Sequence, residues 1–235
     1  MRIGIDLGGT KIEAISIDET GRELLRTRIQ TPHDDYEAIL SAIAGLLEKI
    51  EQQVGVAETV GIGAPGSFSA STGLVKNSNT VCLNGQSLKR DLETRLGRRL
   101  AIENDANCFT LSEALDGAAA GARCVFGVIL GTGVGAGICV DGRLLIGANS
   151  ICGEWGHNPL PWPNDEEHPG RACYCGRHGC IETFLSGSGL ATDYLALGGA
   201  PLPAHEIAIQ ATAGQPLAQK ALSRYTERLA KALAT

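Results

Sequence analysis

Apolar and polar positions alternate with a period of two along the first 30 residues. Residues 2–7, 11–18 and 23–30 each form such a run, and glycine-containing turns separate them. Alternation over this length predicts half-buried strands joined by tight turns. We therefore expect a three-stranded meander at the start of the chain.

The pattern then changes to helical spacing over residues 34–54. Its apolar positions recur every three or four residues, at Ile39, Ile43, Leu46, Leu47 and Ile50. A short apolar run follows at 58–63 and predicts a buried strand. A helix between two strands predicts a parallel crossover connection.

Residues 65–85 are rich in Gly, Ser and Asn and predict a long loop, a feature that is usually functional in a compact domain. Beyond it we expect helices at 88–96 and 106–116 and a strand at 100–103. A second meander follows at 124–130, 135–140 and 143–146, with a hairpin turn at Asp141-Gly142. Helices resume at 182–197, 204–213 and 216–234.

The fold class expected from these elements is α/β with two lobes. We place an N-terminal lobe at 1–117 and a partial C-terminal lobe at 118–235, with an irregular segment at 151–182. The second lobe lacks a further strand or glycine turn after residue 147, and the chain ends inside an amphipathic helical pattern. This pattern is the one expected of a truncated chain.

Charge and composition indicate which kinds of molecule this protein is expected to bind. The formal charge is −6 and no Lys/Arg-rich run is present, which disfavours nucleic acid and anionic membranes as partners. No apolar run is long enough to span a membrane, and Asp6 and Lys11 interrupt any secretory leader. We expect a cytoplasmic protein with a small-molecule partner and reduced cysteines.

The first candidate site is the motif DLGGTK at 6–11. Its glycines let backbone N–H groups approach phosphate oxygens, Thr10 and Lys11 can donate to them, and Asp6 can hold Mg²⁺ through water. A plain hairpin with polar surface residues is the alternative. The candidate nucleotide-binding residues here are Asp6, Gly8, Gly9, Thr10 and Lys11.

Two further glycine-rich stretches follow. Residues 130–137 carry Thr132 and Gly133 at the matching turn of the second lobe and can supply a second set of amides, unless the glycines form a structural bulge. Residues 61–66 match G-x-G-x-x-G, but no helix can begin at the SFSASTG sequence that follows, so a dinucleotide fold is rejected. Asn77, Asn79 and Asn84, in the loop that follows these glycines, either hydrogen-bond sugar hydroxyls or form turns.

The sequence ENDAN at 103–107 stands at a predicted strand-to-helix junction. Asp105 either caps the helix or faces a cleft as the base that takes the proton from an attacking hydroxyl. In the second case Asn104 would orient the substrate.

The sharpest pattern is His157 followed by Cys173-x-Cys175-x-x-x-x-Cys180. One imidazole and three thiolates complete a closed tetrahedral Zn²⁺ shell, which makes a structural rather than a catalytic site. Glu154 and Glu182 flank this site in the sequence.

Together these motifs resemble the ROK family of sugar kinases and repressors, through DLGGTK, ENDAN, GTGVGAG, GEWGH and CYCGRHGCIE. The resemblance implies an actin-like, ribonuclease-H-like fold, MgATP as phosphate donor and Asp105 as the base. Family repressors carry a DNA-binding segment ahead of the first strand, which is not expected here. The residues implied around the sugar are Gly66, Asn79, Asn104, Asp105, Glu154, His157 and Glu182.

Within that family the sequences at 76–86 and around 104–122 and 153–162 look most like bacterial fructokinases. The first expectation is therefore phosphorylation of fructose to fructose 6-phosphate, with mannose or glucose as further substrates. The alternative is an N-acetylglucosamine, N-acetylmannosamine or glucose kinase of the same family. A third hypothesis is a sugar-binding remnant without activity. The family's adenosine-binding segment is expected after the last helix, which is where these 235 residues end.

Two minor expectations complete the set. A glycosidase that uses Glu154 and Glu182 as its carboxylate pair is disfavoured, because it leaves the phosphate turns without a purpose. The helices of the second lobe offer a face for a homodimer.

Overall fold

The computed structural model describes residues 1–234, and the chain divides into two compact units. Unit 1 comprises Met1–Arg123 and Cys139–Ile151, and unit 2 comprises Cys124–Ile138 and Cys152–Thr235. The end of the second meander groups with unit 1 because it packs there, with Leu115 lying beside the Gly142 turn. The lobes predicted from sequence, 1–117 and 118–235, remain a proposal about functional division.

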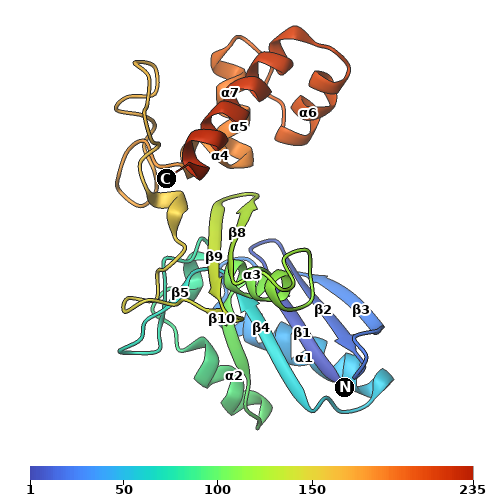
Figure 1. The fold of residues 1–235 in the computed structure, drawn as a ribbon. Coiled ribbons are helices and arrows are strands. Elements are labelled where there is room, and N and C mark those ends of the chain that lie inside the picture. The colour runs from blue at the N-terminus through green and yellow to red at the C-terminus, as the bar shows by residue number, and fades with distance from the viewer. Residues whose placement is uncertain (235) are drawn as a thin grey trace. The chain divides into compact units, whose positions relative to one another are not determined.

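A five-stranded mixed sheet forms the centre of unit 1 (Figure 1). Its strand order is β3-β2-β1-β4-β7, in which β1 pairs antiparallel with β2 and parallel with β4. The predicted meander and the parallel crossover through a helix are confirmed. The elements are β1 Arg2–Leu7, β2 Lys11–Ile17, β3 Glu23–Gln30, α1 Tyr36–Val54, β4 Thr59–Ala64, α2 Leu88–Leu96, β7 Ala101–Asn104 and α3 Asp105–Leu115.

Helix α1 shows how the sequence produces this layer. Asp35 caps it by accepting a hydrogen bond from the Ala38 N–H at 2.9 Å. Its predicted apolar stripe is buried in the main core of unit 1, together with side chains from β1, β2 and β4. The burial of this stripe, and not helix propensity alone, holds the crossover on the sheet.

The segment 65–85 is more ordered than the loop that its composition predicts. It forms a hairpin of β5 Ser67–Phe68 and β6 Val75–Lys76, followed by the short 3-10 helix η1 Val81–Leu83. The Asn84 side chain accepts from the Ser78 N–H and donates to the Ser78 carbonyl, both at 2.9 Å. Buried Val75 and Leu83 join the core, so long-range packing supplies the order that local sequence did not indicate.

The second meander is a three-stranded sheet with order β10-β9-β8, formed by β8 Cys124–Leu130, β9 Val134–Val140 and β10 Arg143–Leu144. Asp141 and Gly142 have φ of 48° and 74°, as the predicted hairpin turn requires. The last strand is two residues shorter than expected.

Unit 2 ends in a group of helices (Figure 1). Their shared core combines large side chains such as Ile207 with small ones such as Ala218 and Ala221. The single helix predicted over 182–197 was wrong: Ser186 interrupts it, and the Ser186 hydroxyl caps the second part by accepting from the Gly189 N–H at 3.0 Å. The helices are α4 Glu182–Leu185, α5 Gly187–Ala196, α6 Ala204–Thr212 and α7 Pro216–Leu233. Among residues 1–234, no helix has the length and apolar character needed to cross a membrane.

A buried ionic network joins helices α5 and α7 to the irregular segment before them. Arg228 Nε lies 2.7 Å from Glu167 Oε1, and Arg228 Nη1 lies 3.0 Å from Asp193 Oδ1. Arg171 Nη2 reaches the same Asp193 oxygen at 3.1 Å. The side chains of Arg228, Glu167 and Asp193 are at most 4% exposed, so each charge relies on its partners in place of water.

We predict that Arg228→Met lowers the free energy of unfolding by about 3–5 kcal/mol, because it removes the one fully buried cation and leaves Glu167 and Asp193 with partly exposed partners only. Arg224→Met is the matched control: Arg224 also pairs with Asp193, but its side chain is 26% exposed, and we expect a loss of about 1 kcal/mol or less. Urea denaturation of both variants measures the difference. Equal losses would contradict the assignment of Arg228 as the central cation.

Candidate active site

The DLGGTK motif forms a tight turn between β1 and β2 in unit 1. The Gly8 N–H donates to the Lys11 carbonyl at 2.9 Å, and the Thr31 hydroxyl donates to the Gly8 carbonyl at 2.7 Å. Asp6 lies near the end of β1, and the side chains of Thr10 and Lys11 are exposed. The Thr31 hydrogen bond thus stabilises the backbone of the turn, while the side chains of Thr10 and Lys11 remain accessible to a ligand.

Helix α3 is capped by Asn104 and not by Asp105. The Asn104 side-chain oxygen accepts from the Asn107 N–H at 3.2 Å, while its amide donates to the Gly66 carbonyl at 2.8 Å. Asp105 is the first residue of the helix, and its carboxylate accepts from the N–H of its neighbour Ala106 at 2.8 Å. The capping role considered for Asp105 therefore belongs to Asn104, and Asp105 remains exposed at the helix start.

Asp6 and Asp105 come together through Gly63. Gly63 pairs with Asp6 in the β1–β4 register, and a Cβ atom placed on Gly63 would lie 3.7 Å from the Asp105 Cα. Desolvation raises the pKa of both carboxyl groups, and the charge of Asp6 raises the pKa of Asp105 further. Two neighbouring carboxyl groups with raised pKa values are typical of a functional site.

The loop beside Asp105 holds its backbone in a position that only glycine permits. Gly66 has φ of 88°, and a Cβ there would lie 2.7 Å from the Lys76 carbonyl oxygen. Three asparagines were considered as sugar contacts. The Asn84 side chain is hydrogen-bonded to the Ser78 backbone, and Asn77 has the left-handed backbone of a turn residue, with φ of 57°. Asn79 is exposed and keeps its candidate role.

In unit 2 the glycine-rich turn joins β8 to β9. The Gly131 N–H donates to the Gly133 carbonyl at 2.9 Å, and the Gly131 carbonyl accepts from the Gly187 N–H at the start of α5 at 2.8 Å. The Glu182 carboxylate accepts from the Val134 N–H at 2.9 Å. One predicted sugar-binding carboxylate therefore lies directly against the predicted phosphate turn, with Thr132 exposed beside it.

The GEWGH segment packs closely on β9. A Cβ on Gly156 would collide with the Val134 carbonyl, so this position must be glycine. Trp155 donates from its indole nitrogen to the Gly135 carbonyl at 3.4 Å and packs edge-on against Phe126. These contacts fix the short 3-10 helix η2 Trp155–His157, and with it the positions of Glu154 and His157.

The four residues predicted to bind a metal converge. The ligand atoms of His157, Cys173, Cys175 and Cys180 all lie within 4.8 Å of one another. His157 Nδ1 is 3.5 Å from Cys173 Sγ, and the sulfurs of Cys175 and Cys180 are 3.6 Å apart. Tetrahedral zinc with bonds of about 2.3 Å to sulfur separates two thiolates by about 3.8 Å, so the donor set fits Zn²⁺.

Tyr174 is a contact that sequence reasoning missed. Its hydroxyl oxygen lies 3.1 Å from His157 Nε2, and the two rings meet edge-on with centroids 5.1 Å apart. The position between two metal-ligand cysteines was the available signal. Partial burial raises the pKa of Tyr174, and the charges of Glu182, Cys173 and Glu154 add to this effect.

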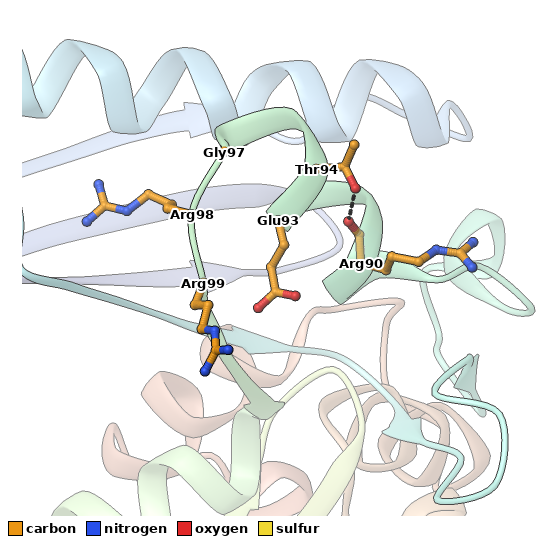
Figure 2. A pocket seen from close by; sticks show the side chains of 6 residues that line it. All are labelled: Arg90, Glu93, Thr94, Gly97, Arg98 and Arg99. Atoms are coloured by element: carbon orange, nitrogen blue, oxygen red, sulfur yellow. Dashed lines mark hydrogen bonds between the residues drawn. The ribbon is translucent and has the colours of Figure 1, made fainter.

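A separate hollow of about 420 Å³ lies at the end of α2 in unit 1 (Figure 2). Two of its charged groups are already paired within the protein: Arg98 pairs with Glu51 at 2.6 Å, and Glu93 accepts from the Leu100 N–H at 2.9 Å. None of the predicted site residues lines it. The residues that line it are Arg90, Glu93, Thr94, Gly97, Arg98 and Arg99.

The ROK family model matches residues 2–235. The chain belongs to the ROK family. The N-acetyl-D-glucosamine kinase of Photobacterium profundum is 40% identical over 238 residues, covering 100% of this chain and 78% of that protein. The enzyme of the same name from Vibrio cholerae serotype O1 is 41% identical, covering 98% of this chain and 78% of that protein.

Solved ROK structures agree in fold. A ROK family glucokinase from Streptomyces griseus, in complex with glucose and AMPPNP, superposes with a TM-score of 0.81 at 30% identity. The match covers 99% of this chain and 78% of that one. The expected α/β class with a mixed sheet is therefore confirmed for this ROK protein.

We predict that Cys175→Ala lowers bound zinc from about one ion per chain to near zero. The substitution removes one of four ligands, and the three that remain do not complete the tetrahedral shell. Cys152→Ala is the matched control, since Cys152 is a free cysteine of the same unit outside the cluster. Metal analysis of the purified proteins is the measurement. Full zinc content in Cys175→Ala would exclude the cluster as the metal site.

We predict that the pKa of Asp105 lies above 3.8 and falls in Asp6→Asn, because the substitution removes a neighbouring negative charge. Carboxyl NMR titration measures this, with Asp18→Asn at the exposed β2–β3 turn as the control. Since the folded chain holds the Asp105 proton more tightly than the unfolded chain, this group's contribution to stability is lost as the pH rises from 3.8 through the folded pKa. An unchanged Asp105 titration in Asp6→Asn would refute the coupling.

Proposed function

We propose that this chain is a sugar kinase that transfers the γ-phosphate of ATP to a hydroxyl group of N-acetyl-D-glucosamine. The observation that carries the proposal is the paired Asp6 and Asp105 beside the DLGGTK turn. This arrangement supplies a magnesium-binding carboxylate and a base within one unit. The names of the relatives at 40% and 41% identity support the choice of sugar.

Each group has a defined task in this reaction. Asp105 accepts the proton of the attacking hydroxyl, and its raised pKa brings it nearer to the working pH of a general base. Asp6 would hold Mg²⁺ through water, and the N–H groups and side chains of the turn at Gly8–Lys11 would bind phosphate oxygens. Thr132 and Gly133 are proposed to contribute donors from unit 2.

The residues proposed to contact the sugar are those that the family motifs imply. Gly66, Asn79, Asn104 and Asp105 are the proposed contacts in unit 1, and Glu154, His157 and Glu182 are those in unit 2. The metal cluster is proposed to hold a structural Zn²⁺ that fixes the last three. When bound, the ion supplies rigidity and no reactive water, because four protein ligands close its shell.

Fructose, the first expectation from sequence, is replaced here by the alternative. The expectation of a fructokinase rested on three short stretches, whereas the relatives that match nearly the whole chain are named N-acetyl-D-glucosamine kinases. Selection among hexoses depends on the few groups around each hydroxyl, which short motifs do not encode.

The test is an ADP-release assay with MgATP and a panel of N-acetyl-D-glucosamine, glucose, mannose and fructose. We expect the highest kcat/KM with N-acetyl-D-glucosamine. Asp105→Asn should lower kcat by roughly 10²- to 10⁴-fold, the usual contribution of a general base. Asp116→Asn, an exposed carboxylate at the other end of α3, should leave kcat unchanged.

Calorimetry on the same samples measures sugar binding, and it distinguishes an active kinase from a chain that binds sugar without turnover. Binding without turnover in the unaltered chain would replace the kinase by the sugar-binding remnant. A preference for fructose would restore the first expectation.

A further inference from the structure

Tyr174 stands out because it presents an aromatic ring to solvent within the metal-binding segment. It lies between Cys173 and Cys175, yet it is 66% exposed while both Cys173 and Cys180 are buried. A tyrosine that served only to fill the interior of this segment would be buried with them. An exposed ring with a polar tip is instead suited to a ligand that is apolar on one face and polar at its edge, as a sugar is.

The two nitrogens of His157 have different partners. Nδ1 faces the sulfur of Cys173 at 3.5 Å, whereas Nε2 faces the hydroxyl of Tyr174 at 3.1 Å. With a metal on Nδ1, the neutral imidazole carries its proton on Nε2 and donates it to the tyrosine oxygen. The hydroxyl hydrogen of Tyr174 is then directed elsewhere and is available to an acceptor on a ligand.

The other two residues proposed for the sugar in unit 2, Glu154 and Glu182, stand next to the metal-binding residues in the sequence. Glu154 immediately precedes the short helix that carries His157, and Glu182 begins α4 two residues after Cys180. Tyr174 therefore contacts one of the three residues that we assign to the sugar in this unit, and the other two lie within three residues of a metal ligand in the sequence.

We propose that Tyr174 contacts the bound sugar directly and is a further specificity-determining residue of the kinase. The inference rests on the proposed function and adds to it a residue outside the set implied by the family motifs. The metal and His157 orient the hydroxyl, and the exposed ring provides a surface for the apolar face of the sugar.

The experiment compares Tyr174→Phe and Tyr174→Ala with the unaltered chain in its zinc-loaded form. Calorimetry measures the Kd of N-acetyl-D-glucosamine, glucose, mannose and fructose. For the sugar that the unaltered chain binds most tightly, Tyr174→Phe should raise the Kd by roughly three- to tenfold, the effect of losing one neutral hydrogen bond. Tyr174→Ala should raise it further, because the ring is lost as well.

His178→Gln is the matched control, since His178 is an exposed residue of the same segment and has no assigned role. We expect it to leave the sugar Kd unchanged. Zinc content is measured for every variant, because a purely structural role of Tyr174 would lower it. The Kd of ATP should be the same in all samples that bind ATP.

The outcomes are distinct. A raised sugar Kd at full zinc content supports a direct contact. A Kd that is unchanged or lower in both tyrosine variants overturns the inference while leaving the kinase proposal intact, and so does a raised Kd that appears only with zinc loss. If the unaltered chain binds none of the four sugars, the proposed function fails and this inference fails with it.

Discussion

The convergence of one imidazole and three thiols on a single point is the constraint on which the candidate sugar site of unit 2 depends. The segment that supplies them has little regular structure: beyond η2 it contains two isolated bridges, Pro159 with Cys180 and Ala172 with His178. Cys180 is followed closely by Glu182, and His157 closely follows Glu154. Holding the four ligands together therefore adds to the contacts with β9 that already position Glu154 and Glu182.

The buried ions around Arg228 support the same segment from its other end. Glu167 and Arg171 belong to the irregular stretch, and they are tied to Asp193 on α5 and Arg228 on α7. Such a network adds less stability than an apolar core of the same volume, because each charge loses its hydration. The network instead favours one arrangement of the segments that carry these charges, since a charge removed from water is stable only where its partners are present.

In unit 1 the candidate residues are instead positioned by regular secondary structure. Asp6 and Asp105 are placed by β1, β4 and α3, whose backbone hydrogen bonds and apolar core leave little freedom. Although both residues are solvent-accessible, desolvation by the surrounding protein raises the pKa of both carboxyl groups, which is a cost to the fold. A regular scaffold can bear that cost because many residues share it, whereas a loop could not hold two carboxylates together.

The sequence by itself determined the strands at 2–7 and 23–30, helix α1, the Asp141-Gly142 turn, the four candidate metal ligands and membership of the ROK family. Each depends on local periodicity, turn chemistry or a dense motif. Only the tertiary structure decided that Asn104 and not Asp105 caps α3, that Asn84 serves Ser78, that Ser186 divides a helix, and that Tyr174 lies against His157. These outcomes depend on which partner each polar side chain meets after the chain has folded, and residue spacing carries no information about that choice.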